Sequence, residues 1–355
     1  MCNGTIMDKL ISFSLPLMLS GILQLMFNAV DIIVIGRFSG SQSLAAVGST
    51  TALINMFTNL FIGISLGANV LSARFYAAGK DKEMSETVHT AITLALISGI
   101  VMALVGLVFS RGALALMGTP DDVIGLSALY MRIYFLGMPF FMLYNYGAAI
   151  LRAVGDTKRP LYFLIVSGVI NAGLNMFLVI VFSLGVAGVA IATVVSQAIS
   201  CLLVLRCLYK SEGSYQLRFS KLCLKKDYII PIFQVGIPAG IQSTVINFSN
   251  VLLQSSVNSF GSIAMAGYTA ANNVLGFLYT SVNSVTQACM SFTSQNYGVG
   301  KYKRMDKVLI DCLILSSGIA LVMGGGAYLF GTEILQIYTG DPEVIRCGME
   351  ILSIT

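Results

Sequence analysis

The stretch VHTAITLALISGIVMALVGLVFS, Val88–Ser110, contains 23 residues without a single Lys, Arg, Asp or Glu. The hydrocarbon core of a bilayer is about 30 Å thick and takes about 20 residues of α-helix at 1.5 Å each. The stretch shows no alternation of period two, so it does not resemble a strand of a membrane β-barrel. It therefore predicts a membrane-spanning helix.

Similar stretches recur along the whole chain. Of its 355 residues, 56% are hydrophobic and 10% are charged, whereas soluble proteins carry about 25% charged residues. The apolar stretches are 10–35, 44–71, 88–110, 124–150, 160–181, 185–208, 229–258, 264–290, 307–331 and an incomplete one from about 344. The sequence therefore predicts an all-α polytopic membrane protein.

The basic residues are divided unevenly between the loops. If the N-terminus is cytoplasmic, the inner segments hold 17 of the 21 Lys and Arg residues and the outer segments hold three. The positive-inside rule therefore predicts a cytoplasmic N-terminus. Because these charges are shared among short loops, they do not indicate a nucleic-acid-binding patch, and we expect no nucleic acid partner.

An internal duplication divides the chain. The segment YAAGKDKEM, Tyr76–Met84, is echoed by YGVGKYKRM, Tyr297–Met305, at an offset of 221 positions. Each copy follows the second stretch of a six-helix unit, so the two units are expected to be parallel repeats. We expect an N-terminal six-helix lobe at 1–208, a cytoplasmic basic linker at 209–228 and a C-terminal lobe at 229–355.

The same offset suggests that the second lobe is incomplete. The first lobe ends near residue 208, so a full second lobe would need about 74 residues more than the chain has,. We expect nine to ten of twelve helices to be present and the C-terminal lobe to lack the others.

Asp31 is the one carboxylate well inside a predicted span. Gln24, Asn28 and Asp31 fall on one face of a helix,. A charged Asp at the bilayer centre costs about 2.5–3.5 kcal/mol on insertion scales, so it usually marks a functional site. An acid at the interfacial end of a helix is the alternative. The functional interpretation is a carboxylate that binds H⁺ or Na⁺ and so biases the lobe between two conformations.

Other polar side chains form stripes inside the predicted spans. They are Asn55 and Asn59, Asn171 and Asn175, Thr193 and Gln197, and Asn247, Asn250 and Gln254. Such amides can join helices by hydrogen bonds worth about 0.6 kcal/mol each, but the aligned stripes favour a polar central cavity. Pro16 and Pro238 occupy matching places in the two repeats, where each is expected to act as a hinge in its helix or to begin it,.

The sequence offers no enzymatic chemistry. It contains no G-x-x-x-x-G-K-[ST] motif, its one histidine, His89, is isolated, and its seven cysteines have no paired spacing,. We therefore expect neither an enzyme nor a cofactor. Transport driven by an ion gradient remains, in which each charge moved is worth about 2.3 kcal/mol per 100 mV.

Several segments together carry a family resemblance. They are AILRAVGDTKRP at Ala149–Pro160, NAGLN at Asn171–Asn175, Gly185–Thr193, and Asn28–Asp31 followed by Leu44–Gly48. These segments resemble the multidrug and toxic compound extrusion (MATE) family, and the resemblance covers essentially the whole chain. It implies a fold of twelve helices in two six-helix lobes.

The resemblance also implies a site and an activity. A cation-coupling site would use Asp31, Asn171, Asn175 and Thr193, with Asp31 as the ligand if the ion is Na⁺. In several relatives an acid replaces Asn175, so the amide here leaves H⁺ and Na⁺ open. The implied protein is a monomeric antiporter of a bacterial plasma (inner) membrane, and it exports amphiphilic, often cationic, drugs or metabolites.

Two alternatives to this antiporter stay open. A lipid-linked oligosaccharide flippase of the same superfamily would have a basic central cavity, yet the predicted spans hold almost no Lys or Arg. A non-transporting membrane fragment is the other alternative.

Overall fold

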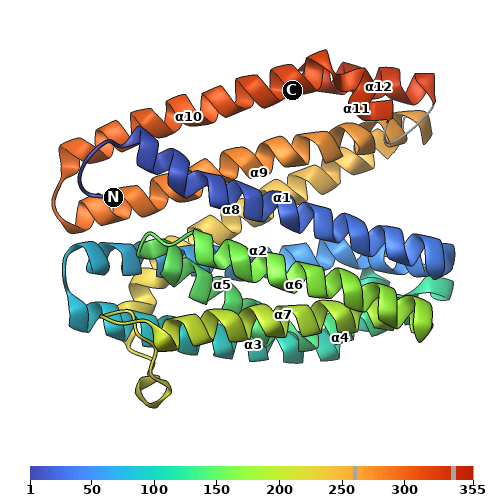
Figure 1. Cartoon of the computed structure of the whole chain (residues 1–355). Helices are drawn as coiled ribbons and strands as arrows, with labels where there is room; N and C mark the ends of the chain where they lie inside the picture. The colour runs from blue at the N-terminus through green and yellow to red at the C-terminus, as the bar shows by residue number, and fades with distance from the viewer. Residues whose placement is uncertain (259–261, 337–340, 355) are drawn as a thin grey trace.

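The computed structural model describes residues 1–258, 262–336 and 341–354, and within these residues it is helical with no strand. The elements are α1 (Met7–Phe38), α2 (Gly40–Ala77), α3 (Asp81–Leu116), α4 (Asp121–Leu136), α5 (Met138–Ala153), α6 (Lys158–Met176), the π-helical segment η1 (Phe177–Val181), α7 (Gly185–Lys210), the 3₁₀ turn η2 (Phe219–Lys221), α8 (Lys226–Asn258), α9 (Ser262–Gly298), α10 (Tyr302–Leu329), α11 (Gly331–Gln336) and α12 (Pro342–Ile354). The long helices run lengthwise through the molecule (Figure 1).

Most of the long helices can cross a membrane. Among the described residues, seven are long and apolar enough: α1, α2, α3, α6 with η1, α7, α8 and α10. The pair α4 and α5 makes an eighth if it forms one span. The predicted polytopic all-α membrane fold is confirmed. The expected stretch 264–290 lies in the long helix α9, which is not among these seven.

The predicted stretch 124–150 is a bent pair of helices. α4 ends at Leu136, α5 begins at Met138, and the two axes differ by 47°. Pro139 in the first turn of α5 has no N–H to continue the hydrogen bonds of α4,. A Cβ added at Gly99 of α3 would stand 2.5 Å from the Cα of Pro139, so α3 packs directly against the backbone of the bend.

The duplicated motif forms the same local structure twice. Gly79 has φ +66° and Gly300 has φ +71°, a left-handed conformation that glycine adopts without steric cost,. The N–H of the next residue, Lys80 or Lys301, donates to a carbonyl five residues earlier, at 3.1 and 2.9 Å. This is the usual way in which a glycine ends a helix, so the repeat fixes two equivalent turns.

The helices fall into two groups joined by α1, α2 and α8. Figure 1 shows α3 to α7 on one side of the molecule and α9, α10 and α12 on the other. α1 packs against α6 in the first group and α9 in the second. Near its start, the ring of Phe13 meets that of Phe292 edge-on at 5.6 Å. α1 is therefore in contact with both groups.

α2 and α8 meet through glycines. A Cβ added at Gly63 of α2 would stand 2.3 Å from the backbone of Gly240, and one at Gly67 would stand 2.1 Å from the carbonyl oxygen of Ile232. Gly236 of α8 is equally close to Ile64 of α2, at 2.4 Å. Each helix thus presents a G-x-x-x-G pattern that lets the two backbones touch. We call this contact the glycine seam.

Pro16 and Pro238 both lie inside helices. α1 begins at Met7 and α8 at Lys226, so neither proline starts its helix. Pro16 is buried, whereas Pro238 is exposed. The expectation of a helix-starting proline is therefore wrong, and the hinge role stays a prediction.

One end of the bundle, which we call the basic end, collects most of the positive charge. It contains the N-terminus and the loops 78–80, 154–157, 211–225 and 299–301 with the adjoining helix ends. The two repeats approach each other there, because the guanidinium of Arg74, two residues before the first motif, lies 4.7 Å from the ring centroid of Tyr297 in the second. Lys301 also donates to the carbonyl oxygen of Cys2 at 3.0 Å and so holds the N-terminus.

Candidate functional site

Asp31 lies toward the end of α1 and faces α6. The side-chain amide of Asn175 donates to Asp31 Oδ1 and also to Asn171 Oδ1, the latter at 3.3 Å. Asn171 and Asn175 are buried, with 6% and 0% of their surface exposed. The structure thus brings three of the four expected cation-site residues into one cluster, although Asp31 and Asn175 are 144 positions apart.

A glycine allows α1 and α6 to approach closely enough for this contact. A Cβ added at Gly168 of α6 would stand 1.9 Å from the ring of Phe27 on α1. Phe27 lies one turn before Asp31, and Gly168 lies about one turn before Asn171. The ring therefore fills the space that a larger side chain at position 168 would need.

Thr193 of α7 takes a different place. Its hydroxyl donates to the carbonyl oxygen of Val189, in its own helix, at 2.9 Å. The hydrogen bonds of the described residues do not join it to Asp31. Because that bond uses only the hydroxyl hydrogen, the oxygen lone pairs of Thr193 can still bind a cation.

Two tyrosines that the sequence did not single out lie within electrostatic range of the acid. Tyr130 and Tyr134 of α4 stack with their ring centroids 6.1 Å apart, and both hydroxyls lie within electrostatic range of the Asp31 carboxylate. The only sequence signal is their spacing of four residues, which is equally typical of ordinary packing. Average hydropathy reveals neither the position of these rings nor the bend that follows α4.

Two buried amide oxygens, one of them beside the acid, have no hydrogen-bond partner among the described residues. They are Asn175 Oδ1 and Gln197 Oε1. An unpartnered buried oxygen costs about 1–3 kcal/mol and often marks the place of a water or an ion. Together with the Asp31 carboxylate, the Asn175 oxygen suits a proton or a hard, oxygen-binding cation,. No group of three His, Cys, Asp or Glu that could hold a transition metal occurs among the described residues.

Among the described residues, no hydrogen bond joins the other polar side chains of the predicted cavity to this cluster. Gln24, Asn28, Asn55 and Asn250 are exposed, whereas Asn59 and Asn247 are half-buried. The Asn247 amide donates to the carbonyl oxygen of Ser243, in its own helix, at 2.9 Å. The side chain of Gln254 lies outside the described residues.

Most of the chain matches a known family of proteins. Residues 16–177 and 238–355 match the MatE family model. This chain belongs to the MATE family. It is therefore a membrane transporter, and the family resemblance seen in segments such as Ala149–Pro160 is confirmed.

Relatives of this MATE transporter include two bacterial proteins. The probable multidrug resistance protein YoeA of Bacillus subtilis (strain 168) is 33% identical over 352 residues, which cover 97% of this chain and 76% of the relative. The multidrug export protein MepA of Staphylococcus aureus (strain NCTC 8325 / PS 47) is 24% identical, covering 99% of this chain and 78% of that protein.

A solved structure shares the fold. It is described as the outward-facing conformation of a multidrug resistance MATE family transporter of the MOP superfamily, and it superposes with a TM-score of 0.92 at 21% identity. The match covers 98% of this chain and 78% of that one. The MATE-like arrangement of helices expected from the sequence is confirmed.

Proposed function

We propose that this MATE transporter is a secondary active antiporter that exports amphiphilic, often cationic, drugs or metabolites in exchange for H⁺ or Na⁺. The relatives described as a probable multidrug resistance protein and a multidrug export protein support drug export. The observation that carries ion coupling is the half-buried Asp31 carboxylate in a membrane-spanning helix, bonded to the buried Asn175.

The proposed site couples ion binding to helix packing. A proton or sodium ion at Asp31 removes a charge whose presence in the membrane is costly. Asn171, Asn175 and Thr193 supply amide and hydroxyl oxygens for the ion,. Because α1 packs against both α6 and α9, a change at Asp31 acts on both groups of helices. Ion binding thereby favours one of two conformations of the transporter.

The proposed topology places the basic end in the cytoplasm of a bacterial cell and the chain in its plasma membrane as a monomer. The distribution of Lys and Arg supports this orientation,. The proposed lobes are 1–208 and 229–355, joined by the linker 209–228. In this arrangement Gln24, Asn28, Asn55, Asn59, Asn247 and Asn250 line the space between the lobes.

The test of coupling is Asp31→Asn in proteoliposomes that contain a fluorescent organic cation. The wild-type protein should drive efflux after a pH jump or a Na⁺ jump, and the jump that works identifies the ion. Asp31→Asn should abolish gradient-driven efflux, because an amide can neither take up the proton nor neutralise the sodium charge. Unchanged efflux in this variant would falsify the coupling role.

A matched control comes from the other group of helices. Asp311→Asn removes the half-buried carboxylate of α10, which plays no part in the proposed site. It should keep gradient-driven efflux. Efflux that is lost equally in both variants would show a general sensitivity to lost carboxylates and would contradict a specific role for Asp31.

A further inference from the structure

We propose that residues 218–226, between α7 and α8, form a binding surface for the headgroups of anionic phospholipids in the membrane leaflet at the basic end. We call these residues the basic strap. The inference uses the orientation proposed above but goes beyond transport, because it assigns a lipid-binding role to a segment outside the ion site.

Charge is the first observation. Residues 206–228 contain six Lys and Arg and two acids, so most of the net charge of +5 is concentrated here. Among the described ion pairs, only Lys225 of these cations meets a carboxylate, that of Glu86. Arg218, Lys221 and Lys226 are exposed. Clustered cations beside a membrane helix are attracted to anionic lipids.

Exposed apolar side chains lie between these cations. Phe219 is 55% exposed, Leu222 36% and Leu224 46%. The Phe219 ring also stacks on Tyr209 at the end of α7, with the centroids 6.0 Å apart. Basic and apolar side chains on one short segment are the pattern of a segment that lies in a membrane interface. An acidic protein or a nucleic acid would neutralise the cations but would not cover these apolar groups.

The strap also lies at the depth of the headgroups. The 36 residues of α3 extend about 54 Å, roughly 12 Å beyond a 30 Å hydrocarbon core at each end. The strap docks on the first turns of α3, where the N–H of Arg218 donates to Nε2 of His89 at 3.0 Å. In Figure 1 the loop after α7 projects sideways from the bundle, alongside α3, rather than beyond the helix ends. It therefore faces the headgroup layer.

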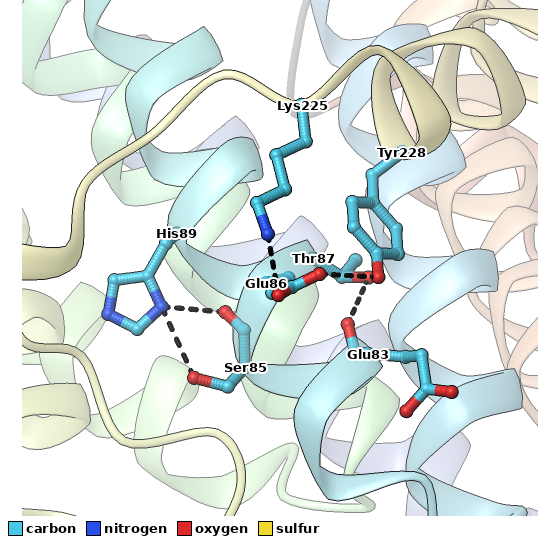
Figure 2. A network of polar contacts seen from close by, with 7 residues as sticks. All are labelled: Glu83, Ser85, Glu86, Thr87, His89, Lys225 and Tyr228. Carbon is cyan, nitrogen blue, oxygen red and sulfur yellow. Dashed lines mark hydrogen bonds and ion pairs between the residues drawn. The ribbon is translucent and has the colours of Figure 1, made fainter.

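Contacts with α3 hold the strap in this position (Figure 2). Glu86 accepts from Tyr228 at 2.7 Å and pairs with Lys225 at 2.6 Å. This carboxylate raises the pKa of Lys225 above its ordinary value through their hydrogen bond. Leu217, just before the strap, is completely buried. His89 Nδ1 donates to the carbonyl oxygen of Ser85 at 2.6 Å, which leaves Nε2 free to accept from Arg218,.

The chain contains no tryptophan, so Phe219→Trp places a single fluorescent probe in the strap. The purified protein is reconstituted in vesicles of phosphatidylcholine and in vesicles that also contain phosphatidylglycerol. With phosphatidylglycerol the emission should shift to shorter wavelength, and lipids with brominated acyl chains should quench it more strongly. Emission and quenching that do not respond to phosphatidylglycerol would overturn the proposal.

Two pairs of substitutions in this background test the origin of the response. Lys221→Gln with Lys226→Gln should remove most of the phosphatidylglycerol response. Lys303→Gln with Lys307→Gln removes the same charge from exposed positions at the same end of the bundle and should leave the response intact. An equal loss in both double variants would assign the phosphatidylglycerol response to the overall charge of the basic end. It would contradict a dedicated surface on the strap.

Glu86→Gln distinguishes the effect of the strap's position on α3 from the effect of its charge. This substitution makes the region more positive, so attraction by charge alone predicts a larger lipid response. Our proposal predicts a smaller one, because Lys225 and Tyr228 lose the carboxylate that holds the strap on α3. A larger response would refute the positioning role of Glu86. These measurements need no transport, so their failure is distinct from a failure of the antiport proposal.

Discussion

At the scale of single residues, the hydrogen bond from Asn175 holds the Asp31 carboxylate against α6. A carboxylate inside a membrane needs a donor or a cation to offset the lost hydration. Asn175 supplies the donor, and its own carbonyl oxygen remains without a partner among the described residues. In the proposed site, this oxygen is available to the coupling cation.

Asn175→Ala should weaken ion coupling without abolishing it. A hydrogen bond to a charged group is worth about 1.5–3 kcal/mol, so the ion concentration needed for half-maximal efflux should change by roughly tenfold to a hundredfold. Titration of efflux against the coupling ion in proteoliposomes measures this change.

The control for this variant is Asn145→Ala. The Asn145 amide donates to the carbonyl oxygen of Phe141, in its own helix, at 2.8 Å. Asn145→Ala should therefore leave the ion dependence of efflux unchanged. An ion dependence that shifts equally in both variants would contradict the specific role of Asn175.

At the scale of elements, the bend between α4 and α5 depends on the packing of α3. Gly99 lies directly against the backbone of Pro139, because a Cβ added at Gly99 would stand 2.5 Å from the Cα of Pro139. This contact supports the bent pair, whose first helix carries Tyr130 and Tyr134. A small residue on one helix therefore helps to set the geometry of the two helices that pack against it.

Gly99→Ala should destabilise the protein, because the backbone at Pro139 cannot move aside as a flexible side chain could. Overpacking of this kind costs about 1–3 kcal/mol. Thermal unfolding in detergent should show a lower midpoint for this variant. Gly112→Ala in the same helix meets nothing within 4 Å and should be neutral or slightly stabilising, since alanine favours a helix. Equal midpoints for the two variants would rule out the packing argument.

At the scale of the whole molecule, the glycine seam brings the two halves of the chain into backbone contact. Gly67 of α2 and Ile232 of α8 approach too closely for any side chain at position 67. Both lie in the parts of their helices nearer the basic end. The seam thus closes that part of the molecule, and a movement that opens the basic end has to separate α2 from α8.

Gly67→Ala should favour a conformation that is open at the basic end. Its Cβ would stand 2.1 Å from a backbone oxygen, so α2 and α8 have to move apart. Spin labels at the exposed positions Lys82 and Lys303, in a background without the native cysteines, should report a longer distance. Gly48→Ala in the same helix meets nothing within 4 Å and should keep the wild-type distance. If Gly67→Ala also keeps it, the seam does not control the opening.

The sequence by itself determined the class of fold, the repeat and the family. Long apolar stretches have one stable solution in lipid, because every backbone polar group has to be bonded within its own helix. The motif around Gly79 and Gly300 is equally local, since a left-handed glycine ends a helix wherever it occurs,. Asp31 could be singled out because a carboxylate in such a stretch is rare.

Only the tertiary structure decided which side chains meet. The bond from Asn175 to Asp31, the approach of Tyr130 and Tyr134, and the glycine seam all join residues far apart in the chain. Hydropathy is averaged over a window of sequence. A glycine that packs against a neighbouring helix therefore scores the same as a glycine that faces open space. The difference between Gly67 and Gly48 exists only once a second helix lies against the first, because helix packing depends on the shapes of both surfaces.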